Sequence, residues 1–151
     1  MNAGRSLAVT IGAALVLAAS WSMRLAAADS PAVTYFDHDK MADALAKGGA
    51  VTRTSDYTVS GAHRGGPGQV EVHDKETDVI YITDGEATFV TGGKMIGGKM
   101  TKEGQWLGTD IQGGETHHMT KGDVVVIPAG TPHWFKEVKS VNYFLVKVIK
   151  P

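Results

Sequence analysis

The sequence predicts an all-β domain, a sandwich or barrel, that follows one short helix and an export signal. After residue 50 the chain consists of short β-branched or alternating apolar runs separated by glycine-rich turns, a pattern typical of sandwiches and barrels. Only the segment 29–50 carries a helical pattern. With 42% apolar residues among 151, the chain has the composition of a globular protein.

The first 28 residues form the predicted signal peptide. Arg5 gives it a positive start, residues 6–20 form an apolar run, and alanines at 26–28 supply the small residues that precede a cut. The run is shorter than the roughly 20 residues of a spanning helix, so an uncleaved anchor is the weaker alternative. We therefore expect a secreted or periplasmic protein that begins at Asp29 and has no membrane attachment after cleavage.

Charge and cysteine content narrow the class of partner. Cleavage would remove Arg5 and Arg24, two of the 15 basic residues, and none of the 16 acidic residues, so the mature chain would carry a formal charge of −3. No basic stripe suggests a nucleic acid partner. Disulfides are excluded because the chain has no cysteine. About 120 mature residues suit one domain.

The helix is expected within residues 29–50. Asp37 or Asp39 can cap its start, and Lys47 with the following glycines gives a cationic last turn and a stop. Its apolar stripe consists of Met41, Ala44 and Leu45. We expect this helix to pack on the outside of the strands.

Nine strands are predicted after the helix. They are Val51–Thr54, Tyr57–His63, Gln69–His73, Asp78–Thr83, Ala87–Thr91, Glu115–Thr120, Val124–Ile127, His133–Phe135 and Val141–Ile149. The interval 92–114 holds eight glycines in 23 residues together with scattered apolar side chains. It is expected to form irregular loops or a long hairpin that folds over one mouth of the barrel.

Metal-binding side chains gather in the stretch 69–85. Val70 and Val72 alternate with Glu71 and His73, so a strand sends the two polar side chains to one face. Asp78 opens the next predicted strand, and antiparallel pairing could fold it back beside them. The stretch is therefore a candidate metal site.

A second segment, residues 122–133, points to a known family. Gly122, Pro128, Gly130 and His133 fit the pattern G-x5-P-x-G-x2-H with every spacing met, and this pattern resembles the second motif of the cupin superfamily. The resemblance implies a small jelly-roll β-barrel, residues 51–151, with the helical arm 29–50 before it.

The first cupin motif, G-x5-H-x-H-x3–4-E-x6-G, is matched in part. His73 stands at its second histidine, Gly85 at its last glycine, Asp78 at its glutamate and Glu71 at its first histidine. The resemblance thus implies that His73, His133, Asp78 and Glu71 bind a metal, and Glu71 is also the candidate catalytic residue. Structural alternatives are a half-buried strand for Glu71 and His73 and a turn-capping role for Asp78.

Other histidines offer alternatives for the site. His117 shares its side of a strand with Met119, so it could reach the lumen and replace the ligand lost at Glu71. His63 is a weaker candidate of the same kind. His38 belongs to the start of the helix and is expected at the surface.

Two imidazoles with one or two carboxylates suit a divalent transition metal, Mn²⁺, Fe²⁺, Ni²⁺ or Zn²⁺. The leading functional hypothesis, by resemblance to cupins, is a metal-dependent enzyme of dioxygenase, isomerase, lyase or decarboxylase type acting on a small oxygenated substrate. The alternative is a non-catalytic exported module that binds a sugar, another small ligand or a metal. A structural or storage role would be favoured if Glu71 paired with Arg64 or Lys75.

Cupin barrels commonly pair, and the resemblance therefore implies a homodimer. The chain has apolar strand residues beyond what one small barrel interior holds, among them Val124, Val126 and Val146. We expect these side chains on an outer face that a second copy covers.

Overall fold

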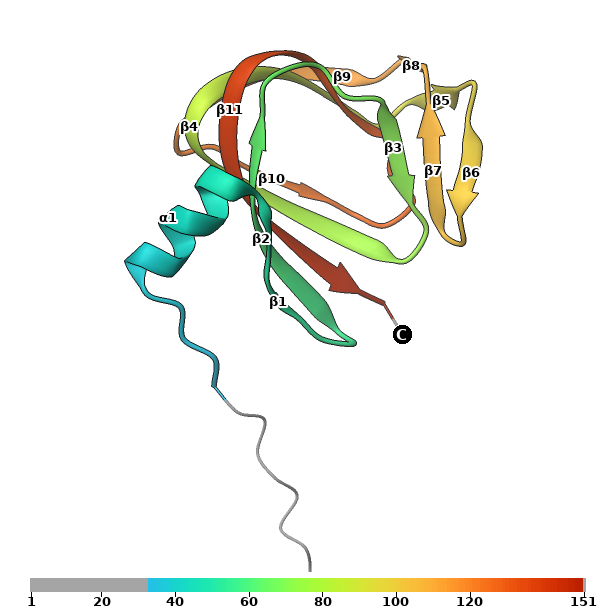
Figure 1. Ribbon diagram of the computed structural model, residues 1–151. Coiled ribbons are helices and arrows are strands. Elements are labelled where there is room, and N and C mark those ends of the chain that lie inside the picture. Colours follow the sequence, from blue (N-terminus) through green and yellow to red (C-terminus); the bar gives the residue numbers. More distant parts are fainter. Residues whose placement is uncertain (1–32, 151) are drawn as a thin grey trace, which may run out of the picture. The chain divides into compact units, whose positions relative to one another are not determined.

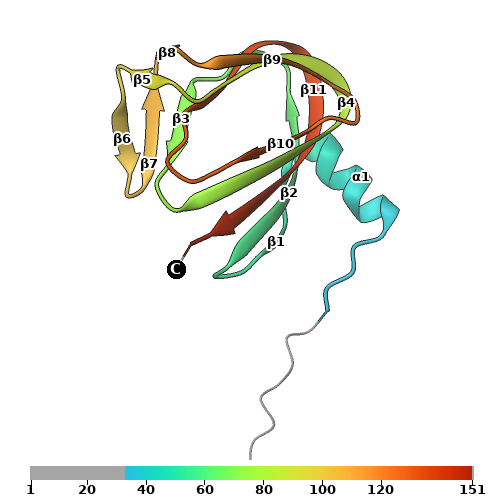
Figure 2. The same ribbon diagram turned by 180° about the vertical axis from the view of Figure 1, so that it is seen from behind.

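One helix and eleven strands make up the part of the chain that the computed structural model describes, residues 33–150, and the strands wrap into a barrel (Figures 1 and 2). The elements are α1 (His38–Lys47), β1 (Gly49–Arg53), β2 (Tyr57–Arg64), β3 (Val70–His73), β4 (Glu76–Thr91), β5 (Lys94–Ile96), β6 (Lys99–Lys102), β7 (Gln105–Gly108), β8 (Asp110–Gln112), β9 (Glu115–Thr120), β10 (Val124–Ile127) and β11 (His133–Ile149). This is the jelly-roll barrel with a short N-terminal helix that the sequence predicts. The predicted signal peptide and Asp29 lie outside the described residues.

Helix α1 has the predicted caps and the predicted position. Asp37 accepts a hydrogen bond from the Lys40 N–H at 2.8 Å, and the Gly48 N–H donates to the Ala44 carbonyl at 2.9 Å. The helix lies on the outer face of β2, where a Cβ on Gly61 would stand only 2.4 Å from the Ala44 backbone. Glycine at position 61 therefore permits the close approach of the helix to the sheet. No helix in residues 33–150 is long and apolar enough to cross a membrane.

Two long strands, β4 and β11, replace four of the predicted short ones. They contain 16 and 17 residues and pair antiparallel along nearly their whole length. Of the two intervals expected to be turns, 84–86 pairs with β11 and 136–140 holds two β-bulges. Lys136 and Lys139 are extra residues on β11, and Thr83 is an extra residue on β4. Bulges bend the paired strands, which lets them curve around the barrel without a break (Figure 1).

The core lies between the curved sheets. Inward-facing residues of β4, β9, β10 and β11 form one buried cluster, consisting of Ile80, Ile82, Ala87, Phe89, Met119, Ile127, Phe135, Val141 and Tyr143. Phe135 is central, since its ring centroid is 4.6 Å from that of Phe89 and 5.1 Å from that of Tyr143. Ile80 and Ile82 alternate along β4 and bury the same face of that strand.

Strand β3 does not pair with β4, contrary to the expected hairpin. It pairs with β7, and its Glu71 lies opposite His133 of β11. The turn between β3 and β4 is anchored elsewhere, because the Asp74 N–H donates to Gly104 and the Lys75 carbonyl accepts from Lys150. These bonds carry the chain from one sheet edge to another, so Asp78 approaches β3 from across the barrel.

The glycine-rich interval 92–114 forms a long nested hairpin, one of the two expected forms. Strands β6 and β7 make its inner part, and β5 and β8 pair as a separate two-stranded sheet beside them (Figure 2). Because β7 pairs antiparallel with β3, Gln105 lies directly opposite His73. The hairpin therefore borders the predicted site.

Candidate metal centre

The four residues singled out as metal ligands come together inside the barrel. His73 Nε2 lies 3.5 Å from Glu71 Oε2 and 3.4 Å from Asp78 Oδ2, and His133 Nε2 lies 3.8 Å from the same Asp78 oxygen. The two imidazole rings are 5.1 Å apart. His73, His133 and Asp78 are buried, whereas Glu71 is partly open to solvent.

Both histidines are held with Nε2 toward this cluster. The Gln105 amide N–H donates to Glu76 at 3.1 Å, which leaves the Gln105 oxygen to accept a hydrogen bond from His73 Nδ1. His133 Nδ1 donates in the same way to the Thr131 carbonyl at 3.0 Å. The hydrogen of each neutral ring is thereby placed on Nδ1 and the lone pair on Nε2, the arrangement found in metal-binding histidines.

The loop between β10 and β11 is fixed against β3. The Gly130 N–H donates to the His73 carbonyl at 2.8 Å, and the Pro132 carbonyl accepts from the Gly92 N–H at 2.8 Å. These bonds position the backbone on either side of Thr131, whose carbonyl orients the His133 ring. The two sequence motifs are thus joined by a direct backbone contact.

Lys147 belongs to the site although the sequence analysis did not single it out. Its Nζ lies 2.9 Å from Glu76 Oε2 and 3.0 and 3.1 Å from the two oxygens of Asp78. Asp78 therefore has an ammonium partner within the chain. A pairing of Glu71 with Arg64 or Lys75 would have favoured a structural role. No ion pair in residues 33–150 joins Glu71 to either residue, and its charged neighbour is His73.

The pKa shifts of the two histidines have opposite signs. Burial lowers the pKa of His73, but the neighbouring carboxylates of Asp78 and Glu71 outweigh it and raise that pKa above the ordinary 6.5. Burial also lowers the pKa of His133; here the Thr131 carbonyl and the acids do not compensate, so the pKa stays below 6.5. One ring thus favours positive charge between the acids, and the other favours the neutral form.

The acids on the opposite side are held in their ionised forms. Burial raises the pKa of Asp78, but His73 and Lys147 together lower it below the ordinary 3.8. Burial also raises the pKa of Glu76. The Lys147 ammonium lowers it by more, so the pKa of Glu76 falls below 4.5. Glu76 and Asp78 thus share the Lys147 ammonium, and Glu71 lies beside His73.

A metal ion fits this donor set. His73 Nε2 is buried and makes no hydrogen bond within residues 33–150, and it lies 3.5 Å from Glu71 Oε2 and 3.4 Å from Asp78 Oδ2. Donors about 2.0–2.1 Å from one ion stand at most about 4.2 Å apart, a limit that the 3.4–3.8 Å separations satisfy. Two overlapping groups each bring one donor atom of every member within 4.8 Å of the others, Glu71–His73–His133 and His73–Glu76–Asp78.

Neither of the alternative histidines contributes a donor to these clusters. His117 Nε2 lies 3.1 Å from the Thr91 hydroxyl, and His63 Nδ1 lies 2.8 Å from the Asn142 side-chain oxygen. His38 is exposed, as expected for the start of the helix. The expectation that His117 could replace a ligand fails because its ring is held at the β4–β9 edge.

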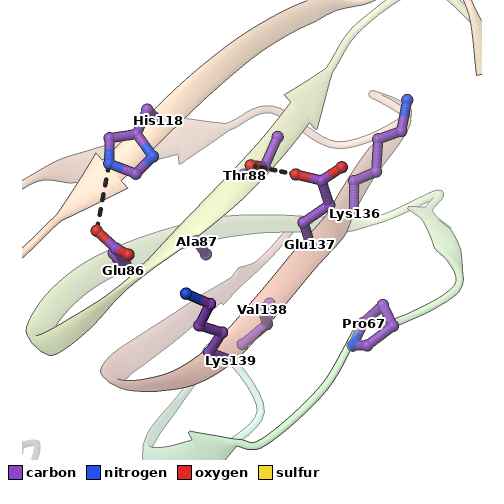
Figure 3. Close-up of a pocket in the computed structure, with 9 residues that line it drawn as sticks. All are labelled: Pro67, Glu86, Ala87, Thr88, His118, Lys136, Glu137, Val138 and Lys139. Atoms are coloured by element: carbon purple, nitrogen blue, oxygen red, sulfur yellow. Dashed lines mark hydrogen bonds and ion pairs between the residues drawn. The ribbon is translucent and has the colours of Figure 1, made fainter.

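A larger hollow lies elsewhere on the barrel, beside the bulges of β11 (Figure 3). It has a volume of about 480 Å³, compared with about 120 Å³ for the cavity at the histidines. Four of its polar side chains are paired, since His118 lies 3.4 Å from Glu86 and Thr88 donates to Glu137 at 3.1 Å. We therefore place the candidate chemistry in the smaller, buried cavity, where a polar atom has no partner.

A jelly-roll barrel with histidines and carboxylates converging in its interior is the architecture of cupins. The cupin family profile matches residues 32–150. The chain therefore belongs to the cupin family. No curated protein matches the chain at a significant level.

A solved structure with a TM-score above 0.5 shares this fold. A Bacillus halodurans protein shares 12% identity, with 83% of this chain and 86% of that chain covered and a TM-score of 0.56. A Klebsiella pneumoniae protein with a double-stranded β-helix domain shares 18%, with coverages of 66% and 69% and a TM-score of 0.48. Hydroquinone 1,2-dioxygenase from Sphingomonas sp. TTNP3, solved with 4-hydroxybenzoate bound, shares 11%, with coverages of 68% and 65% and a TM-score of 0.49. At these identities the likeness concerns the fold.

Proposed function

We propose that this cupin binds a divalent transition metal through Glu71, His73 and His133, and that it is a metal-dependent enzyme for a small oxygenated substrate. The observation that carries the proposal is the buried, unpartnered Nε2 of His73, which faces carboxylates while Nδ1 is fixed by Gln105. Two imidazoles and one carboxylate form a donor set suited to Mn²⁺, Fe²⁺, Ni²⁺ or Zn²⁺.

Asp78 has a different role from the other three candidates. Both of its oxygens accept from Lys147, so it contributes charge and orientation beside the metal and becomes a ligand only if it leaves the ammonium. When bound, the metal would act as a Lewis acid on a substrate oxygen. If Glu71 does not bind the metal, it is the candidate base, because its side chain is 35% exposed and lines the cavity that a substrate would enter.

A non-catalytic binding module is the second candidate. The Lys147 ammonium supports it, since a cation supplied by the chain already neutralises Asp78 and the barrel interior is satisfied there without an ion. Such a module would retain metal or ligand binding and show no turnover. Export to the periplasm or the medium and pairing into a homodimer are proposed for either function.

Metal content and melting temperature of the purified protein test the metal site. A metal at a hundredfold excess over its Kd stabilises the folded state by roughly 2.7 kcal/mol, and chelation reverses this. His73→Ala and His133→Ala should abolish the shift and Asp78→Ala should weaken it. His63→Ala, at an exposed histidine outside the cluster, should leave the shift unchanged. Unaltered metal content in both of the first two variants would refute the site.

Glu71→Gln separates the two functions. Loss of metal would make Glu71 a ligand. A Glu71→Gln variant that retains metal but loses turnover would make Glu71 a base. A parent protein that binds metal but shows no turnover would favour the binding module.

A further inference from the structure

The cavity at the candidate metal centre has a second charged feature, Arg64 at the end of β2. Of the candidate metal ligands, Glu71, Asp78 and His133 line this cavity. The rest of its lining consists of Arg64, Lys147 and an apolar wall that includes Phe135, Tyr143 and Leu145. Its volume is about 120 Å³, which is room for about four water molecules at ~30 Å³ each. The space therefore suits a small molecule with an apolar part and a charged or polar part.

The two cations of the cavity differ in what they contact. Lys147 is engaged by the carboxylates of Glu76 and Asp78. Arg64 makes no ion pair within residues 33–150; its Nε is buried without a hydrogen-bond partner, and its guanidinium carbon lies 5.1 Å from the centroid of the Phe135 ring. A buried guanidinium donor without an acceptor is costly, so an anionic or carbonyl ligand at this position would be favourable.

The loop after β2 holds Arg64 in this position. Gly68 is tied to β11 on both sides, since its N–H donates to the Phe135 carbonyl and its carbonyl accepts from the Trp134 indole, each at 2.8 Å. A Cβ at Gly68 would stand 2.7 Å from Arg64 Nη1. Glycine therefore leaves space for the guanidinium, and Phe135 supports it from within the barrel.

Charge balance indicates the sign of the ligand. Three carboxylates surround the centre, and Lys147 and Arg64 compensate two of them. A divalent cation would turn the remaining negative charge into one excess positive charge, which a single monocarboxylate would neutralise. Arg is the side chain best matched to a carboxylate, because its planar fork donates two parallel hydrogen bonds.

We propose that the cavity binds a short organic monocarboxylate, with Arg64 on the carboxylate and the apolar wall against the carbon chain. This inference rests on the proposed function and names its substrate class. The cavity volume limits the ligand to about four to six non-hydrogen atoms. Arg64 is then a specificity-determining residue that distinguishes an acid from its neutral amide.

Propionate and propionamide are matched probes, because they have the same size and differ in charge. Binding to Mn²⁺-loaded and to chelator-treated protein is measured by calorimetry, with circular dichroism and melting temperature as folding controls. Propionate should bind more tightly than propionamide, and Arg64→Met should weaken propionate about 10- to 100-fold, the value of one charged hydrogen-bond pair. Arg53→Met removes an exposed arginine of β1 and should change nothing.

Two further variants keep the test decisive if Arg64→Met does not fold. Arg64→Lys keeps the charge and loses the fork, and Gly68→Ala displaces the guanidinium without altering the charge; both should weaken propionate. Equal binding of propionate and propionamide, or propionate affinity that none of these variants alters, overturns the proposal.

The comparison of Mn²⁺-loaded with chelator-treated protein tests the anion site and the metal site separately. Arg64-dependent propionate binding in chelator-treated protein, together with no metal uptake, would support the anion site and refute the metal site. A His73-dependent metal shift with Arg64-independent propionate binding would support the metal site and refute the anion site.

Discussion

Replacing Lys147 with methionine should destabilise the metal-free protein by about 3 kcal/mol. The substitution keeps the aliphatic stem and removes an ammonium that contacts three carboxylate oxygens at 2.9–3.1 Å. Removing one partner of a buried ion pair costs about 3–5 kcal/mol. We take the lower end because the Lys147 and Glu76 side chains are 22% and 26% exposed, so water can relieve part of the cost.

A thermal melt of the chelator-treated protein measures this effect. For a domain of this size about 3 kcal/mol corresponds to a fall of about 10 °C in Tm. Lys139→Met is the matched control, since Lys139 is exposed on the same strand and should leave Tm nearly unchanged. Added Mn²⁺ should raise Tm more in Lys147→Met than in the parent, because the freed carboxylates then face the ion. A variant that melts within about 2 °C of the parent would refute the role given to the ammonium.

Three further predictions concern acid stability, assembly and export. The pKa values of Glu76 and Asp78 lie below their ordinary 4.5 and 3.8, so the stability they contribute is present above those values and is lost as pH falls through the folded-state values. The urea midpoint should therefore drop between about pH 5 and pH 3, and an unchanged midpoint would count against it. Val124 and Val126 are 58% and 59% exposed on the outer face of β10, so changing both to lysine should convert a dimer to a monomer in light scattering; a monomeric parent at micromolar concentration contradicts the pairing. Intact mass from the native host should place the mature N-terminus at Asp29, and a mass that retains the first 28 residues would disprove cleavage.

The local part of the site could be predicted from the sequence. Alternation in β3 places Glu71 and His73 on one face, and the spacing from Gly122 to His133 indicates a fixed turn before a strand. Burial of Asp78 follows from its sharing a strand face with Ile80 and Ile82, which are 3% and 0% exposed. These inferences depend only on the two-residue period of a strand, which neighbours in the sequence determine.

The long-range part of the site could not be predicted in the same way. Lys147 lies in a run of β11 that is apolar on both faces, with Tyr143 and Leu145 inward and Val146 and Val148 on the other face, so alternation does not identify which face its side chain joins. Its pairing with Asp78 depends on the β4–β11 register, which includes bulges at Thr83, Lys136 and Lys139 that alternation does not reveal. In the same way, the position of Gln105 opposite His73 depends on the pairing of β7 with β3.

The two bulges of β11 constrain how this strand tolerates length changes. His133 before the bulges and Lys147 after them are both odd-numbered and both face inward, because the extra residues Lys136 and Lys139 reverse the alternation twice. Because neither extra residue has a partner on β4, removing either one leaves the remaining pairs in place and Lys147 opposite Asp78. Removing a paired residue between His133 and Lys147 would instead shift the register by one and bring a neighbouring valine into the ion-pair position. The bulges are therefore the positions of β11 at which a single-residue deletion is compatible with the centre.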